Sequence, residues 1–336
     1  MFLVEKTHLT SPFKLTGKKP SKNYQLAARN FDEKVIVHLE TLDLASEASD
    51  SSVISLNWMC KAVTLLSTVH VEAQDQIYQI SNLRSESDYY HNLYMDYSQK
   101  VLDLLNLVSS AVKQLVERRL LLNLSLRLIK SSGDGQISSP EKLNKAKDAL
   151  IRSVHVHHKQ DEKTQRVKDL LEELSDVINN IPIGKVNNAR DLIRHTLHGL
   201  GTITVFVNSV LVSVLYGQSD LVEVRVPTEF RWVDSVTGVQ KRAFDLKRPK
   251  RLLEVEDAAT RAVAVCDVID EVAAGGDGDG GDERRSRLED GVKELREAVE
   301  KFSDGVDMLT NGVNGLFSCV MKTRNGVLDG VRKGEW

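Results

Sequence analysis

The chain has 336 residues and a net charge of −3, and 28% of its residues are charged whereas 5% are aromatic. A near-neutral chain has no general attraction for nucleic acid or for an acidic lipid surface, and its length allows one large domain or two ordinary ones. Only six prolines and abundant leucine, valine, lysine and acidic residues favour a mainly helical protein. Because Cys60, Cys266 and Cys319 are far apart, we expect buried thiols of a reducing compartment and neither a disulfide framework nor a zinc site.

The first 24 residues are basic and rich in serine and threonine, with Glu5 as their single acid. Their longest apolar run, Met1 to Val4, is too short for the core of a signal peptide. We expect residues 1–24 to form a disordered basic tail. The composition also suits a plastid transit peptide, which stays open as the alternative.

Apolar residues at helical spacing predict several helices in the first half of the chain, starting near Gln25. A polar, acidic break at 46–52 separates the first helix from the second, which is capped by Ser51 or Ser52. The other predicted helices cover 25–47, 88–130, 140–158 and 161–179. Between 120 and 129 apolar residues surround much of the third helix, so this end is expected to be deeply buried.

The 25 residues from His195 to Ser219 contain no lysine, arginine or carboxylate. They belong to a predicted helix over 185–217, and at about 1.5 Å per residue they would extend about 37 Å, enough to cross a hydrocarbon layer of roughly 30 Å. Polar residues such as Thr202 and Asn208 interrupt the stretch. We therefore favour a buried core helix, with a membrane span at 197–217 as the alternative.

Two further helices are predicted at 228–248 and 250–273, after a short alternating segment at 222–226. A Gly/Asp-rich segment at 275–282 is typical of a flexible linker. We expect residues 25–333 to form a single helical-bundle domain that contains this linker.

The last predicted helix, after the Gly/Asp-rich segment, shows the clearest regularity in the sequence. From Val292 to Val320 a valine recurs every seven residues, and a leucine or phenylalanine stands four residues before each of these valines, which is the heptad pattern of an apolar seam. We expect this seam to bind other helices, either in the same chain or in a partner. Its residues are Leu288, Val292, Leu295, Val299, Phe302, Val306, Leu309, Val313, Leu316 and Val320.

Small residues flank the seam, where an exposed two-stranded coiled coil normally carries charges. This column is Gly291, Ala298, Gly305, Gly312, Cys319 and Gly326. Small residues allow another helix to approach closely, so we favour packing within the chain over a self-pairing coil. The uncharged central helix is the expected partner of this glycine column.

No motif in the sequence supports catalysis or cofactor binding. The acidic segment 277–282 lacks the glycine and glutamate that a calcium loop requires at its sixth and twelfth positions. The cluster His155 to His158 has no two histidines four residues apart, so we interpret it as a polar helix end, with a metal enzyme as a weaker hypothesis. The basic run 247–251 lacks any groove-reading motif. We expect no enzyme, no cofactor, no bound metal, no nucleic acid and no small-molecule substrate.

Several segments between about residues 25 and 333 resemble the plant Bypass family. Motif residues of the resemblance are Trp58, Met59, His70, Asp103 and Trp232. Asp96, Lys100, Ser139, Pro140 and Glu229 extend it along the chain in the same order. At the N-terminus only the short run Ser11 to Lys14 is similar, and the Gly/Asp-rich segment departs from the family pattern.

The resemblance implies an all-helical plant protein without known catalysis, linked to root and shoot development through restraint of a mobile root-derived signal. It also implies a connection of relatives with the secretion machinery and a plastid-targeted founding member. The predicted fold is an all-α, elongated multi-helix bundle of long antiparallel helices, ending in the heptad-patterned helix.

We therefore expect a non-enzymatic interaction or regulatory protein with protein partners, either cytoplasmic or membrane-associated, with a plastid location as the alternative. The alternative function is a single-pass membrane protein that uses 197–217 as its span and acts in the organisation of membranes or of the secretory pathway.

Overall fold

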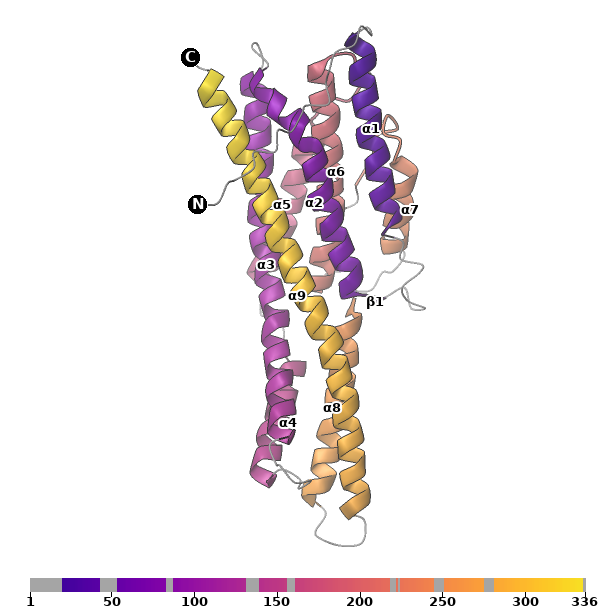
Figure 1. Ribbon diagram of the computed structural model, residues 1–336, viewed down its shortest axis with the longest axis vertical. Coiled ribbons are helices and arrows are strands. Elements are labelled where there is room, and N and C mark those ends of the chain that lie inside the picture. The colour runs from indigo at the N-terminus through magenta and orange to yellow at the C-terminus, as the bar shows by residue number, and fades with distance from the viewer. Residues whose placement is uncertain are drawn as a thin grey trace, which may run out of the picture.

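Long helices that run along one common axis build the protein, as its computed structural model shows (Figure 1). The structure describes residues 20–42, 53–82, 87–130, 139–155, 161–217, 222, 224–244, 251–274 and 281–334. The helices are α1 (Pro20–Glu40), α2 (Leu56–Tyr78), α3 (Ser87–Lys130), α4 (Pro140–Val154), α5 (Asp161–Asn179), α6 (Ala189–Tyr216), α7 (Val233–Phe244), α8 (Leu253–Ala274) and α9 (Gly281–Gly334). A 3-10 turn, Gln79–Asn82, follows α2. The predicted all-α fold is confirmed.

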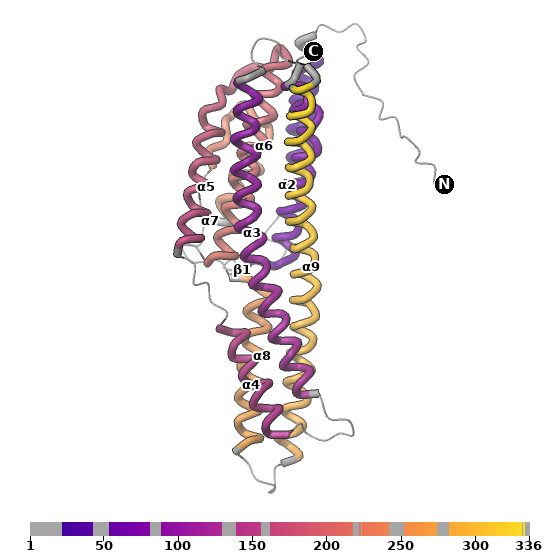
Figure 2. The backbone as a smooth tube through the Cα atoms, turned by 90° about the vertical axis from the view of Figure 1, so that its left-hand side faces the viewer, coloured from indigo at the N-terminus to yellow at the C-terminus, as the bar shows by residue number. Residues whose placement is uncertain are grey.

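The two longest helices, α3 and α9, are antiparallel and connect an upper and a lower part of the bundle (Figures 1 and 2). The lower part consists of α4, α8, the C-terminal half of α3 and the N-terminal half of α9. The upper part contains α1, α2, α5, α6 and α7 together with the remaining halves of α3 and α9. Ion pairs on the surface join neighbouring helices of the lower part, for example Lys147 of α4 with Asp270 of α8 and Arg261 of α8 with Glu294 of α9.

Helix α9 packs against α2, α3 and α8 of the same chain. The flanking glycines permit close approach, because a Cβ atom at Gly305 would lie 2.7 Å from a side-chain carbon of Leu56 and one at Gly312 would lie 3.3 Å from Val63. At Gly326 the neighbour is the Tyr78 ring of α2. The prediction that the uncharged helix contacts this glycine column is wrong: the column faces α2, and further down it faces α8.

A contact between distant segments fixes where α2 begins. Val53–Ile54 (β1) pairs in parallel with Arg251–Leu252 (β2), the residues just before α8. Ser55 caps α2 by accepting a hydrogen bond from the Trp58 amide, and the carboxylate of Glu254 accepts one from the Leu56 amide at 3.0 Å. The predicted caps Ser51 and Ser52 lie outside the described residues. The two-residue pairing with a segment about 200 positions away explains why the helix is capped by Ser55 and not by Ser51 or Ser52, since all three serines are suitable caps.

Several other boundaries differ from the predictions. Helix α1 begins at Pro20, so residues 20–24 are helical and do not belong to a tail; 1–19 lie outside the described residues. Of the predicted linker, residues 281–282 form the start of α9, and 275–280 are not described. Helix α4 ends four residues earlier than predicted, and α7 begins five residues later than predicted.

The lower half of α3 is less buried than its apolar sequence predicts. Leu120 and Leu124 are 62% and 48% exposed, whereas Leu122 and Leu126 on the opposite face are buried in the core. The predicted deep burial over 120–129 is therefore wrong for the outer face, because α4 and α9 cover only the flanks and the inner side of the helix (Figure 2).

Helix α6 lies in the core of the upper part and contacts α1, α2, α3 and α5. Asn188 caps its start by accepting a hydrogen bond from the Asp191 amide, and Gly217, with φ of 64°, ends it in the left-handed conformation that favours glycine. By length and composition α6 is the one helix among the described residues that could cross a membrane. Its whole apolar window is buried by protein, as expected for a core helix.

Two glycines of α9 test the close contact with α2. At Gly305 an added methyl group would also lie 2.8 Å from the Cβ of Leu56, so α2 would have to move. We expect Gly305→Ala to lower the free energy of unfolding by about 1–2 kcal/mol, because overpacking outweighs the gain in helix propensity. The measurement is urea unfolding followed by circular dichroism.

The matched control is Gly315→Ala in the same helix, where an added Cβ meets no atom within 4 Å. This change should raise the free energy of unfolding by about 0.5–1 kcal/mol. Equal stabilisation by both changes would contradict the packing role of Gly305.

Candidate functional site

The ten residues of the heptad seam lie in the chain's own core. All of them, from Leu288 to Val320, are at most 8% exposed. They face the interior formed with α2, α3 and α8. In this structure the seam is therefore a packing surface and is not open to a partner helix.

The motif residues of the resemblance are mostly internal as well. Trp58, Met59, His70 and Trp232 are fully buried or nearly so. The Trp58 indole donates a hydrogen bond to the Leu42 carbonyl oxygen at 3.1 Å, which joins α2 to the end of α1. Most of these residues thus determine how helices pack against one another.

A buried carboxylate joins α1, α6 and the segment before α7. Asp32 is 3% exposed, and its Oδ1 accepts hydrogen bonds from His195 Nε2 at 2.9 Å and from Trp232 Nε1 at 3.1 Å. The amide of Arg231 lies 3.4 Å from its other oxygen. The sequence did not lead us to expect Asp32 in this centre. Its signal is an acid at helical spacing from Val35 and Leu39, inside an otherwise apolar stripe.

Aromatic rings enclose one side of the Asp32 cluster. The ring centre of Phe230 lies 4.4 Å from that of His195 and 4.7 Å from that of Trp232. Gly199 leaves space for this packing, since a Cβ there would lie 3.0 Å from Phe31 and 3.2 Å from Phe230. The glycine and the aromatic rings together exclude water from the carboxylate.

A second buried cluster lies between α2, α3 and α6. His70 stacks on Tyr97 with ring centres 6.3 Å apart, and the Tyr97 hydroxyl forms a 2.8 Å hydrogen bond with Thr204 Oγ1. Burial lowers the pKa of His70 to about 4 and raises that of Tyr97. Burial also lowers the pKa of His198 to about 4. Near neutral pH these three rings are therefore uncharged and pack against their neighbours.

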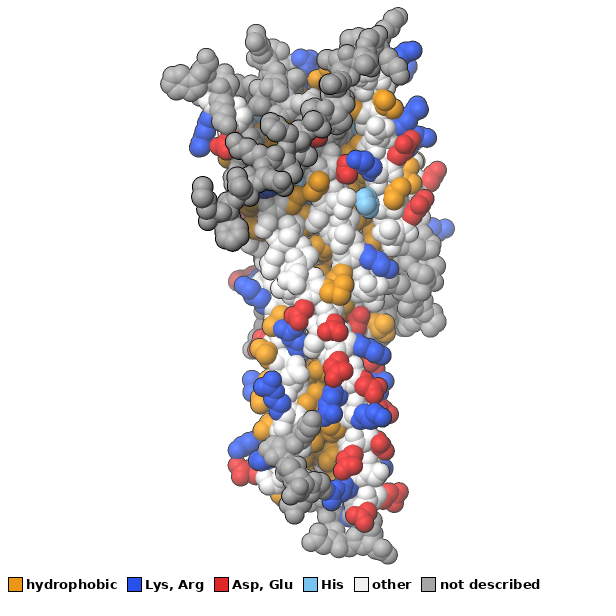
Figure 3. Space-filling view, viewed as in Figure 1, with side chains coloured by type: hydrophobic (Ala, Val, Ile, Leu, Met, Phe, Trp, Pro, Cys, Tyr) orange, Lys and Arg blue, Asp and Glu red, His pale blue; other side chains and the backbone are white. Residues whose placement is uncertain are grey.

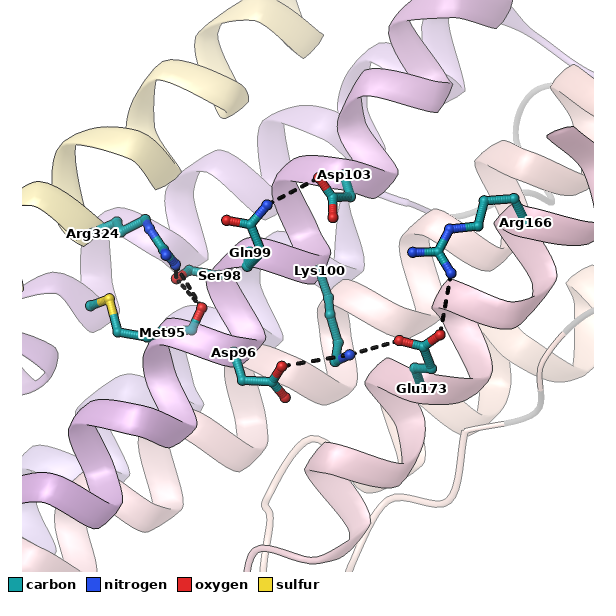
Figure 4. A network of polar contacts seen from close by, with 9 residues as sticks. All are labelled: Met95, Asp96, Ser98, Gln99, Lys100, Asp103, Arg166, Glu173 and Arg324. Carbon is teal, nitrogen blue, oxygen red and sulfur yellow. Dashed lines mark hydrogen bonds and ion pairs between the residues drawn. The ribbon is translucent and has the colours of Figure 1, made fainter.

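Residues 95–103, near the upper end of α3, connect α9 to α5 (Figure 4). Arg324 of α9 donates hydrogen bonds of 2.6 Å to the Met95 carbonyl oxygen and to Ser98 Oγ. On another side of α3, Lys100 Nζ lies 2.6 Å from a carboxylate oxygen of Glu173 on α5. These contacts fix α3 between two helices that are distant in the sequence.

Acidic groups surround Lys100 at the surface (Figure 4). Its Nζ also lies 3.5 Å from Asp96, and Glu173 is approached by Arg166 at 3.4 Å. The hydrogen bond from Lys100 lowers the pKa of Glu173 below its usual range. Asp103 accepts a hydrogen bond from Gln99 at 3.1 Å and is the one motif residue of the five that is not buried. The acids beside Lys100, Asp96 and Glu173, are both ion-paired with basic side chains. The network therefore consists of paired charges and does not contain two free carboxylates that could act as acid and base.

A hollow of about 510 Å³ lies between α3 and α9 in the lower part. Apolar side chains lie between charged ones of both signs along this part of the surface (Figure 3). The residues that line the hollow are Asn123, Leu126, Arg127, Arg296, Val299, Glu300, Ser303 and Asp304. An open, mixed-charge hollow with a small apolar base suits polar side chains of a protein partner better than it suits an apolar small molecule.

Among the described residues, no three histidine, cysteine, aspartate or glutamate side chains lie close enough together to hold a metal ion. His155 is exposed at the C-terminal end of α4, and the remaining histidines of its cluster lie outside the described residues. Burial raises the pKa of Cys60 and of Cys266 to about 11, so both are protonated thiols near neutral pH.

Fold and surface together define an all-helical bundle with buried aromatic and polar cores and a charged exterior. Comparison with known proteins gives its relatives. Residues 171–331 match the family model described as "Protein ROH1-like". The chain is similar to "Protein BPS1, chloroplastic" of Arabidopsis thaliana, with 24% identity over 340 aligned positions that cover 96% of this chain and 89% of that protein.

The chain is also similar to "UPF0496 protein 4" of Oryza sativa, in the subspecies japonica and indica, with 27% identity over 268 positions. These alignments cover 75% of this chain but 57% of each rice protein, so the chain spans less than two thirds of their length. No solved structure matches the chain. The chain is thus similar to BPS1 along nearly its whole length and to the ROH1-like proteins over 171–331, which confirms the resemblance to the Bypass family.

Two neighbouring acids of α1 test the buried carboxylate. Asp32→Ala would leave the His195 and Trp232 donors without their acceptor in the core. We expect it to lower the free energy of unfolding by about 2–5 kcal/mol, because two buried donors lose their acceptor and each costs about 1–3 kcal/mol.

The control is Glu33→Ala, which removes an exposed ion pair with Arg231. Exposed pairs contribute little, so this change should cost less than about 1 kcal/mol. Thermal and urea unfolding of both variants provide the comparison, and similar losses for the two would argue against a structural role of Asp32.

Proposed function

We propose that this chain is a non-enzymatic helical interaction protein that acts in plant root and shoot development. The observation that carries the proposal is the similarity to BPS1 along nearly the whole chain. The Bypass resemblance further implies that it restrains a mobile root-derived signal. Its contribution would be to bind proteins and not to transform a substrate.

The division between core and surface supports this proposal. Trp58, His70 and Trp232 are buried, so the residues that carry the resemblance maintain the bundle. Two polar surfaces are open to partners: the network around Lys100 on α3 and the mixed-charge hollow between α3 and α9. Partner choice would then depend on paired charges, which favour specificity and orientation.

We propose a cytoplasmic or membrane-associated location, with a plastid location as the alternative. The name of the Arabidopsis relative includes the word chloroplastic, which supports the alternative for this chain. The tail that would carry a transit signal, residues 1–19, lies outside the described residues.

A grafting experiment tests the developmental role. Rootstocks that lack this protein are joined to wild-type shoots, and shoot growth is measured against grafts on wild-type rootstocks. We expect reduced shoot growth on the mutant rootstocks, and recovery when the wild-type coding sequence is returned to the root. Normal shoots on rootstocks that lack the protein would contradict restraint of a root-derived signal.

The membrane alternative would require α6 to leave the core. Thr204 is hydrogen-bonded to Tyr97 of α3, and Ser209 Oγ accepts a hydrogen bond from the Val222 amide at 2.8 Å. A helix that crosses the bilayer alone would lose such partners, and its polar groups would enter hydrocarbon at a cost. The contacts of α6 therefore support a core helix.

Alkaline carbonate extraction of membranes from cells that express the full chain tests the span. We expect full release of the protein into the soluble fraction, because a peripheral or soluble bundle has no segment in the bilayer. Retention in the pellet, with release only by detergent, would favour the span at 197–217 and its role in membrane or secretory organisation.

A further inference from the structure

The outer face of the lower half of α3 exposes two leucines one helical turn apart. Leu120 is 62% and Leu124 is 48% exposed. Among the described residues the other large exposed apolar side chains occur singly or several turns apart on their helices. In Figure 2 this half of α3 lies between α4 and α9. Single exposed apolar side chains are common on protein surfaces, whereas contiguous apolar patches mark contact sites.

Opposite charges lie on either side of the leucine pair. Glu117 precedes Leu120 by three residues, and Arg127 follows Leu124 by three residues, so all four side chains lie on one face of the helix. Both charged residues are exposed. The structure gives no ion pair for either of them within the residues that it describes.

The spacing on this face is symmetric about its centre. Positions 117 and 127 are equally distant from the midpoint between Leu120 and Leu124. A twofold axis at that midpoint brings Leu120 of one copy opposite Leu124 of the other. The same axis brings Glu117 of one copy opposite Arg127 of the other, in both halves of the contact.

We propose that a second copy of this chain binds here, with the two α3 helices antiparallel. The contact then contains two leucine layers between two intermolecular ion pairs. A parallel arrangement would bring Glu117 opposite Glu117 and Arg127 opposite Arg127, which like charges disfavour. The symmetric spacing therefore fits a second copy of this face, and charge complementarity selects the antiparallel direction. The small apolar centre predicts a weak dimer that dissociates on dilution.

Sedimentation velocity of the full chain over a range of concentrations tests the dimer. We expect dimer at high concentration and monomer at low concentration. Leu124→Ser should raise the dissociation constant by at least about tenfold, because the twofold axis removes the leucine twice. The matched control is Met308→Ser, which changes a 57% exposed apolar side chain on α9 and should leave the dissociation constant unchanged.

Charge reversal tests the antiparallel direction. Glu117→Arg and Arg127→Glu should each weaken the dimer, and the double variant should restore it because the ion pairs re-form with exchanged signs. Circular dichroism checks that these surface variants stay folded. A monomer at every concentration, a dimer that is insensitive to Leu124→Ser, or a double variant weaker than both single ones would overturn the proposal.

Discussion

The close approach of α9 to α2 is the constraint on which the architecture depends. Gly305 and Gly312 remove the side chains that would separate the two backbones, and Leu56 and Val63 occupy the space. A helix with this many glycines is intrinsically weak, so its seam must be buried to hold it. Burial against three helices at once gives α9 that support and connects the upper part of the bundle to the lower part.

Polar groups give the core its specificity. Apolar stripes can slide along one another at modest cost, whereas the Asp32 carboxylate has acceptors in fixed directions for His195 and Trp232. Thr204 and Tyr97 fix the register of α6 on α3 in the same way. The buried hydroxyl and imidazole groups of α6 therefore favour one arrangement of its neighbouring helices.

How far the sequence predicts the structure depends on whether the signal is local. The heptad pattern predicted α9 and its buried face, and the bounds of α5 follow from its apolar period and its flanking residues. Periodicity shows which face of a helix is apolar but not which helix covers it. This is why the partner of the glycine column was mistaken and why Leu120 was expected inside. The Asp32 centre and the Glu254 contact at the start of α2 depend on partners roughly 160 to 200 residues away.

The order of the helices along the chain has a consequence for biosynthesis. Helix α9 follows α2, α3 and α8, the three helices that it packs against. As the ribosome works from the N-terminus, those helices emerge with the apolar faces that receive Leu295, Phe302 and Leu309 still uncovered. The nascent bundle therefore cannot close until α9 has left the exit tunnel. During that interval the apolar faces of these helices stay exposed to solvent.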